Sequence, residues 1–159
     1  MIRKAVPADL DAVLSIYRSA RSFMAASGNP TQWGDDYPHT ELVIADIDCA
    51  RLFVDEVQGR VCGVFMFAQE DDPTYARIKD GAWISSESYA VIHRVASDGS
   101  VPGVFSRCLD FCRGQYPHLR MDTHKDNKRM QALLTKAGFV RCGIIYAPDD
   151  TPLIAYELI

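Results

Sequence analysis

A single histidine lies in the most strand-like segment of the chain. His93 belongs to Tyr89–Ala96, which is rich in β-branched residues and is expected to form a strand. It alternates with Val91 and Val95, so it could face a cleft with them. Because an unperturbed histidine titrates near neutral pH, His93 is a candidate general base. A hydrogen-bonded histidine of the core or sheet is the alternative interpretation.

A loop and the start of a helix follow this strand. Ser97–Pro102 is expected to be the loop and Gly103–Arg113 the helix. The unpaired N–H groups and positive dipole end of a helix N-terminus favour an anionic phosphate. An ordinary strand-to-helix turn would give the same pattern. Neither GxxxxGK[ST] nor GxGxxG occurs here, which argues against a nucleotide P-loop and a Rossmann dinucleotide site.

Charge is unevenly distributed along the chain. The net charge is −4, which argues against general nucleic-acid binding. Residues 91–145 hold nine lysines and arginines against four acids, a net charge of +5, and the remainder carries −9. This asymmetry is compatible with an anionic ligand such as a phosphorylated cofactor, or with ordinary surface charge.

Composition limits the class of protein. The 159 residues, 48% of them hydrophobic, suit one domain with a substantial core. No apolar run approaches the ~20 residues of a membrane helix, and the apolar N-terminal stretch is too short for a signal peptide, so we expect a cytoplasmic protein. The five cysteines, including Cys108 and Cys112 on one helix face, are expected to be reduced core thiols, and no metal site is expected.

The surrounding pattern alternates strands and helices. Strands are expected at Ile2–Val6, Leu52–Val57, Arg60–Ala68, Leu119–Thr123, Phe139–Tyr146 and Leu153–Leu158. Helices are expected over residues 10–24, 40–45 and 126–137. Residues 70–89 are polar and expected to be irregular. The order predicts an α/β fold with helices on the faces of a mixed sheet.

Two stretches carry a resemblance to a known family. Ser100-Val101-Pro102-Gly103-Val104-Phe105 occupies the place of a [Q/R]-x-x-G-x-[G/A] loop, although only Gly103 matches. Residues 119–139, with an Asn-started helix ending in Gly138-Phe139, match more closely. The chain therefore resembles the GCN5-related N-acetyltransferase (GNAT) superfamily over essentially its whole length. The resemblance implies a single domain over residues 1–159, with a mixed, mostly antiparallel sheet of about six to seven strands and about four helices.

The resemblance implies a site for acetyl-CoA. The pantetheine arm would pair with the strand at Val95, and backbone N–H groups from Ser100 to Ser106 would hold the pyrophosphate. Pro102 donates no N–H, and Phe105 stands where the family keeps a small residue. The expected cofactor-binding residues are Val95, Ser100, Val101, Gly103, Val104, Phe105, Ser106 and Asn127. Arg107, Lys128 or Lys136 could assist near the phosphates, and Asn127 could equally be a helix cap.

The resemblance also implies direct transfer of the acetyl group to a primary amine. This reaction needs a base for the ammonium and an acid for the thiolate. The family's usual tyrosine acid is replaced by Leu134. His93 and Tyr146 are the expected catalytic residues, with His124 a weaker candidate and catalysis by proximity a further alternative.

The acceptor pocket of the family is built from the first helices and the last hairpin. Tyr17, Trp33 and Tyr37, with His39, are therefore candidates for substrate binding, and a hydrophobic plug is the alternative for Trp33 and Tyr37. The expected partners are acetyl-CoA and an amine acceptor, and neither nucleic acid nor a membrane is expected to bind. A homodimer is compatible with the sequence. The alternatives are a related domain that binds CoA or another ligand without catalysis, and a purely structural domain.

Overall fold

Local sequence patterns locate nearly all the elements of the chain. The computed structural model describes residues 1–159. The order and type of strands and helices predicted from sequence are confirmed, with bounds that differ by a few residues. The elements are β1 (Ile2–Lys4), α1 (Leu10–Ala26), α2 (Thr40–Asp48), β2 (Leu52–Val57), β3 (Arg60–Ala68), β4 (Ala90–Ser97), α3 (Val104–Gln115), β5 (Leu119–Thr123), α4 (Lys128–Lys136), β6 (Val140–Tyr146) and β7 (Pro152–Leu158).

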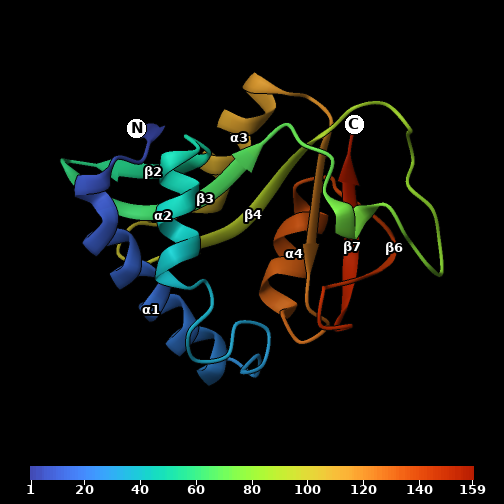
Figure 1. Ribbon diagram of the computed structural model, residues 1–159, viewed down its shortest axis with the longest axis horizontal. Helices are drawn as coiled ribbons and strands as arrows, with labels where there is room; N and C mark the ends of the chain where they lie inside the picture. The colour runs from blue at the N-terminus through green and yellow to red at the C-terminus, as the bar shows by residue number, and fades with distance from the viewer. The chain divides into compact units, whose positions relative to one another are not determined.

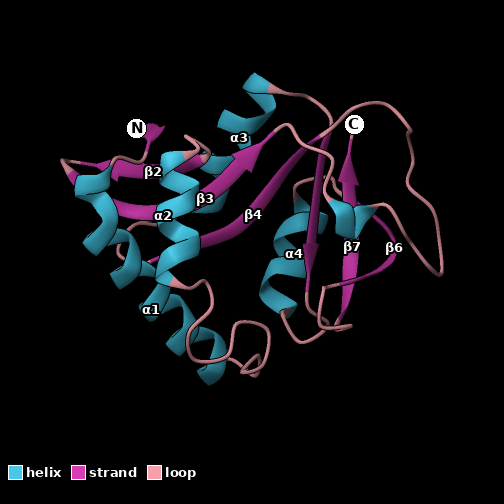
Figure 2. Cartoon of the chain, in the orientation of Figure 1, coloured by secondary structure: helices cyan, strands magenta, loops and turns pink.

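The strands form one mixed sheet. It has seven strands in the order β1-β2-β3-β4-β5-β7-β6 (Figure 2). β4 and β5 run parallel, paired at Ala90↔Leu119 and Val91↔Arg120. The pairs β1–β2, β2–β3, β5–β7 and β6–β7 are antiparallel. The predicted α/β class with a mostly antiparallel sheet is confirmed.

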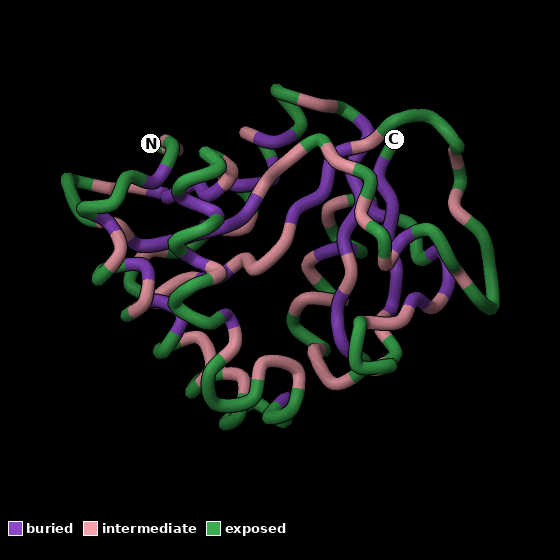
Figure 3. The backbone as a smooth tube through the Cα atoms, in the orientation of Figure 1, coloured by how far each residue is buried: buried purple, intermediate pink, exposed green.

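The chain divides into two compact units. The first contains Met1–Phe67 and His93–Phe111, and the second contains Ala68–Ile92 and Cys112–Ile159. In both units long buried stretches follow the strands (Figure 3). None of the helices combines the length and the hydrophobicity that a membrane-spanning segment needs.

The first unit packs helices on both faces of its strands. α1 and α2 lie in front of β2 and β3 in Figure 1, and α3 lies behind them. Phe53 of β2 stacks on Phe65, its partner in β3, with ring centroids 5.5 Å apart. Phe111 of α3 lies 5.2 Å from the ring of Phe53. These aromatic contacts attach α3 to the sheet, because buried aromatic rings contribute large apolar areas.

In the second unit, residues 69–89 form an irregular but anchored segment, which we call the strap. The predicted irregularity is confirmed, although a short 3₁₀ turn spans Pro73–Tyr75. Tyr75 is 2% exposed, and its hydroxyl donates to Asp122 of β5 at 2.7 Å. The guanidinium of Arg120 lies 4.0 Å from the ring centres of both Trp83 and Tyr89. The strap is therefore held by buried contacts, which its polar composition does not indicate.

A buried carboxylate organises the same unit. Glu157 of β7 has no exposed surface. It accepts hydrogen bonds from Arg120, His118 and the backbone N–H of Ile84. Burial opposes its charge, but the His118 hydrogen bond and the other donors outweigh burial and lower the pKa of Glu157. An ionised carboxylate in the core is tolerable only with such partners.

Candidate functional site

The loop after β4 is shaped by one carboxylate. Asp98 accepts hydrogen bonds from the backbone N–H of Ser100 at 2.9 Å and from its hydroxyl at 2.5 Å. Its other oxygen pairs with Arg60 at 2.6 Å. Partial burial opposes the charge, but the Ser100 and Arg60 contacts outweigh it and lower the pKa of Asp98. The N–H of Ser100, a predicted phosphate donor, is thus already engaged.

The N-terminus of α3 has backbone N–H groups that donate no backbone hydrogen bond. Gly103 has φ +80°, which favours glycine, and a Cβ there would lie 3.2 Å from Nη1 of Arg107. The first intrahelical bond runs from the N–H of Arg107 to the carbonyl of Gly103 at 3.1 Å. The N–H groups of Val104, Phe105 and Ser106 precede this donor and have no backbone acceptor. They fit an anion at this end of α3.

Some basic residues of the 91–145 segment already form ion pairs and hydrogen bonds with other parts of the protein. Nε of Arg107 donates to buried Asp55 at 2.8 Å, and Nη1 donates to the carbonyl of Pro102 at 2.8 Å. Arg120 pairs with Glu157 in the same way. The acids of these pairs lie outside the segment, so the charge asymmetry of the sequence partly reflects internal ion pairs.

Arg94 interrupts β4 in an unusual conformation. Its φ of +53° is left-handed, which is uncommon for a residue with a long side chain. The Tyr17 hydroxyl donates to its carbonyl at 3.0 Å, and Nη2 pairs with Asp46 at 2.6 Å. Burial opposes the charge of Arg94, but Tyr37 and Asp46 outweigh it and raise the pKa. The residue is therefore fixed on both its backbone and its side chain.

The predicted acceptor residues form a row beside Arg94. The rings of Tyr17 and Trp33 are 5.7 Å apart, and Trp33 and Tyr37 are 6.2 Å apart, both edge to face. Tyr37 continues to His39 at 6.2 Å. Tyr17 has no exposed surface, whereas Trp33 and Tyr37 are half-buried. The three residues are thus brought together, with Tyr17 as the inner member.

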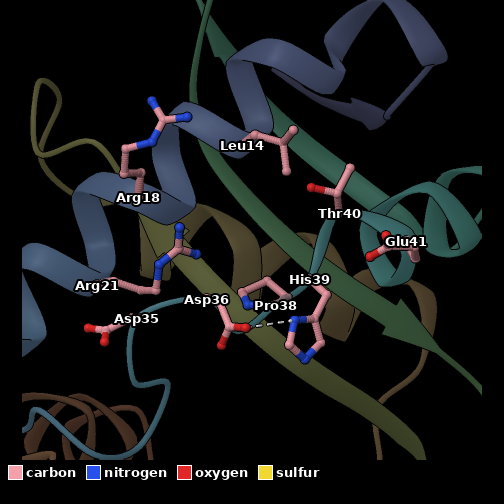
Figure 4. Close-up of a pocket in the computed structure, with 9 residues that line it drawn as sticks. All are labelled: Leu14, Arg18, Arg21, Asp35, Asp36, Pro38, His39, Thr40 and Glu41. Carbon is pink, nitrogen blue, oxygen red and sulfur yellow. Dashed lines mark ion pairs between the residues drawn. The ribbon is translucent and has the colours of Figure 1, made fainter.

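A pocket of about 300 Å³ opens next to this row. In Figure 4 the arginines of α1, Arg18 and Arg21, lie on the same side as Asp35, and Thr40 and Glu41 lie on the opposite side. Asp36 pairs with His39 at 3.3 Å. The lining residues are Leu14, Arg18, Arg21, Asp35, Asp36, Pro38, His39, Thr40 and Glu41. Charges of both signs line the pocket, which suits a polar ligand.

The predicted catalytic residues belong to different strands. His93 of β4 is half-buried, but left-handed Arg94 separates it from Val95 and interrupts the alternation on which the prediction rested. Tyr146 ends β6 and is half-buried, and Nζ of Lys79 lies 5.4 Å from its ring centre. His124 is 6% exposed, and its Nδ1 accepts the N–H of Asp126 at 3.1 Å. That contact suits a residue at the entry to α4.

Two further positions of the predicted site have structural roles. Asn127 caps α4, because its side-chain oxygen accepts the N–H of Met130 at 3.0 Å. Leu134, at the position of the family's tyrosine acid, has no exposed surface and belongs to the core. α2 begins at Thr40, where the sequence predicts a helix to begin, and His39 is its N-cap residue.

Comparison with solved structures identifies the fold. The chain is similar to a GNAT-family acetyltransferase from Streptococcus agalactiae 2603, with a TM-score of 0.91, 28% identity, and coverage of 100% of this chain and 94% of the other. The chain has the GNAT fold. No protein-family model matches the sequence, and a search of curated proteins finds no match.

Other structures with the GNAT fold extend the comparison. A Staphylococcus aureus Mu50 protein, provisionally assigned as an acetyltransferase, has a TM-score of 0.70 and 26% identity, with 99% of this chain and 97% of the other covered. The yncA protein of Salmonella typhimurium, solved with its cofactor acetyl-CoA, has a TM-score of 0.61 and 18% identity, with 99% and 92% covered. The resemblance predicted from sequence is confirmed, and it extends over the full chain.

Sequence reasoning missed three acids within this GNAT fold. Asp46, Asp55 and Asp98 each hold an arginine or a loop near β4. Asp46 lies on the apolar face of α2 between Val43 and Ile47, and that placement was the only available signal. An acid on an apolar helix face needs a buried partner.

Proposed function

We propose that the chain, as one domain over residues 1–159, is an acyl-CoA-dependent N-acetyltransferase. It transfers the acetyl group of acetyl-CoA to a primary amine of an acceptor by direct attack. The observation that carries the proposal is the set of unpaired backbone N–H groups at the N-terminus of α3, which follows β4 in a chain with the GNAT fold. The full-length likeness to acetyltransferases supports the reaction class.

The residues after β4 fit the pyrophosphate of acetyl-CoA. Unpaired N–H groups at Val104, Phe105 and Ser106 provide donors, and Gly103 allows close backbone approach. Asp98 contributes a negative charge nearby, which its ion pair with Arg60 partly neutralises. Val101 remains a proposed contact of the same loop. Asn127 remains a proposed contact as well, with its oxygen committed to the α4 cap.

β4 has a backbone edge suited to an extended ligand. The N–H of Asp98 donates to Cys62 of β3 at 3.1 Å. Because backbone groups alternate sides along a strand, the N–H groups of Ser97 and Val95 point away from β3. A pantetheine arm could pair with this edge in the manner of an added strand.

Acetyl-CoA supplies the thioester that the amine attacks. We assign His93 as the base that takes a proton from the ammonium and Tyr146 as the acid for the leaving thiolate. Leu134 offers no acid at the usual position. Trp33 and Tyr37, with the mixed-charge pocket beside them, are the proposed acceptor site, and Tyr17 supports them from within.

Calorimetric titration with acetyl-CoA and with CoA tests the cofactor site. The informative variants are Gly103→Asp and Gly103→Asn, because both side chains tolerate the left-handed conformation and differ in charge. We expect saturable binding by the native protein. The aspartate variant should bind at least about tenfold more weakly than the asparagine variant, because only the carboxylate repels phosphate.

The outcomes separate the candidate functions. Absence of binding at millimolar ligand would overturn the acetyltransferase proposal. Binding together with formation of an acetylated amine and free CoA, over a panel of primary amines, supports it. Binding without turnover on any amine would favour the alternative, a related domain that holds CoA without catalysis.

A further inference from the structure

The pocket beside α1 contains two arginines that pair with no acid of the protein. Arg18 is exposed and has neither an ion pair nor a hydrogen bond with another residue. Arg21 is half-buried and donates one long hydrogen bond, from Nη1 to the carbonyl of Tyr37 at 3.3 Å. Their remaining N–H donors are available to a ligand in the pocket.

The spacing of the two arginines places their charges together. Residues three apart on a helix are neighbours on its surface, so Arg18 and Arg21 bring two positive charges to one wall. Asp35 lies on the same side of the pocket in Figure 4, yet it forms an ion pair with neither arginine. Like charges so close repel each other unless an anion lies between them. A planar guanidinium binds a carboxylate through two parallel N–H donors, and this wall offers two such groups.

The other charges of the pocket restrict what that anion can be. Glu41 lies opposite the arginines in Figure 4, and Asp36 is paired with His39 at 3.3 Å. With Asp35, three acids line the pocket against two arginines. A phosphate dianion would meet the repulsion of these acids, and an amine without an anionic group would leave the arginines unneutralised. A molecule that carries one charge of each sign complements both walls.

We propose that the pocket binds a small zwitterionic amine of the amino acid type. Its carboxylate pairs with Arg18 and Arg21, and its ammonium group meets the acids of the pocket. The volume of about 300 Å³ is at the lower end for ligand sites, which restricts the ligand to a small molecule. Leu14 and Pro38 supply apolar surface for a short carbon chain.

This inference rests on the proposed function for the role of the ligand, which is then the acetyl acceptor. Tyr37 joins the pocket to β4, because its carbonyl accepts from Arg21 and its hydroxyl accepts from Nη1 of Arg94 at 3.4 Å. The pocket and this part of β4 belong to the same compact unit. The acceptor class is accordingly amines that also carry a carboxylate.

The kinetic test uses amino acids and the amines that lack only their carboxylate, such as β-alanine with ethylamine and 4-aminobutyrate with propylamine. We expect the native kcat/KM to be at least about tenfold higher for the amino acid of a pair. Arg18→Gln should reduce this preference by about tenfold, mainly through KM, and leave the amine nearly unchanged. Glu41→Gln should weaken both members of a pair. The matched control is Arg113→Gln, at an exposed arginine of α3 outside the pocket, and it should change neither.

Binding without cosubstrate provides a second readout, which does not depend on catalysis. The NMR signals of the Nε–H groups of Arg18 and Arg21 should shift on addition of the amino acid and stay unchanged with the matched amine. A stronger response to inorganic phosphate than to the amino acid would overturn the zwitterion assignment. Equal kcat/KM for the two members of every pair, or unchanged arginine signals at millimolar amino acid, would overturn the inference. A protein that binds no acetyl-CoA would instead overturn the proposed function, while the NMR titration would still decide what the pocket binds.

Discussion

Arg107 of α3 joins the buried Asp55 of β2 to the loop that precedes the helix. Its Nε lies 2.8 Å from one oxygen of Asp55, while Nη1 lies 2.8 Å from the carbonyl of Pro102. Asp55 has no exposed surface, and the Arg107 side chain is 36% exposed. The pair therefore couples the sheet to the start of α3.

Removing this arginine should destabilise the protein. In Arg107→Gln, Asp55 keeps only the amino group of Met1, 3.6 Å from its other oxygen. We expect a loss of about 2 kcal/mol in the free energy of unfolding, less than for a fully buried pair, because Arg107 is partly solvated. Urea unfolding measures it. Asp55→Asn added to Arg107→Gln should recover part of the loss, and strict additivity would contradict the pairing.

Asp98 should make stability depend on pH at the acidic end. Its contacts with Ser100 and Arg60 lower its pKa below the ordinary 3.8. The stabilisation is therefore complete above about pH 4 and is lost as pH falls through the folded-state pKa. Asp98→Asn should cost about 1 kcal/mol near neutral pH and much less at strongly acidic pH. A difference that stays constant across this range would refute the assignment.

The stability of the strap should depend on the planar guanidinium of Arg120. Its guanidinium lies between Trp83 and Tyr89 and donates to the carbonyl of Ser85 at 2.7 Å. Lysine keeps the charge but loses the stacking and the fork of donors, so Arg120→Lys should cost about 2 kcal/mol. Hydrogen exchange should accelerate over residues 83–89. Arg113→Lys, at an exposed position of α3, is the control and should leave hydrogen exchange over residues 83–89 unchanged.

The thiols should fall into two classes of reactivity. The expectation that all five cysteines lie in the core is wrong for Cys49, which is exposed, whereas the other four cysteines are buried. Burial raises the pKa of Cys62, and raises that of Cys142 to about 11. Since the thiolate is the reactive form, a thiol reagent near neutral pH should rapidly modify the thiol of Cys49 alone in the folded protein. Cys49→Ser should abolish that phase, and rapid loss of more than one thiol would contradict the burial.

The elements were predictable because their signals are local. The turn Gln58-Gly59 between β2 and β3 has positive φ at both residues, as a tight hairpin requires, and the strand bounds on both sides match. The burial of Cys108 and Cys112 followed from helical spacing. The anchoring of the strap was not predicted, because its polar composition hides the long-range contacts of Tyr75 and Arg120.

The candidate site was predictable only in part. The loop at Gly103 and the row formed by Tyr17, Trp33 and Tyr37 came from pattern and resemblance. The acids that organise the site, such as Asp46, were not predicted, because Asp46 and its partner Arg94 are 48 residues apart in sequence. The hydrophobic periodicity of a sequence does not indicate which residues so far apart along the chain form an ion pair. The left-handed φ of Arg94 is equally hidden, since arginine has no preference for it.

The strap has a further consequence at the edge of the sheet. β6 is an outer strand, yet both backbone hydrogen-bonding groups of Ile144 are taken by Lys79, each at 2.8 Å. Gly143 permits this approach, because a Cβ there would lie 2.5 Å from the Lys79 carbonyl. Another chain could not extend the sheet through the middle of β6 without first displacing Lys79. The segment that packs around Arg120 thus also shields an open strand from adding a neighbour, the step by which exposed edges begin to aggregate.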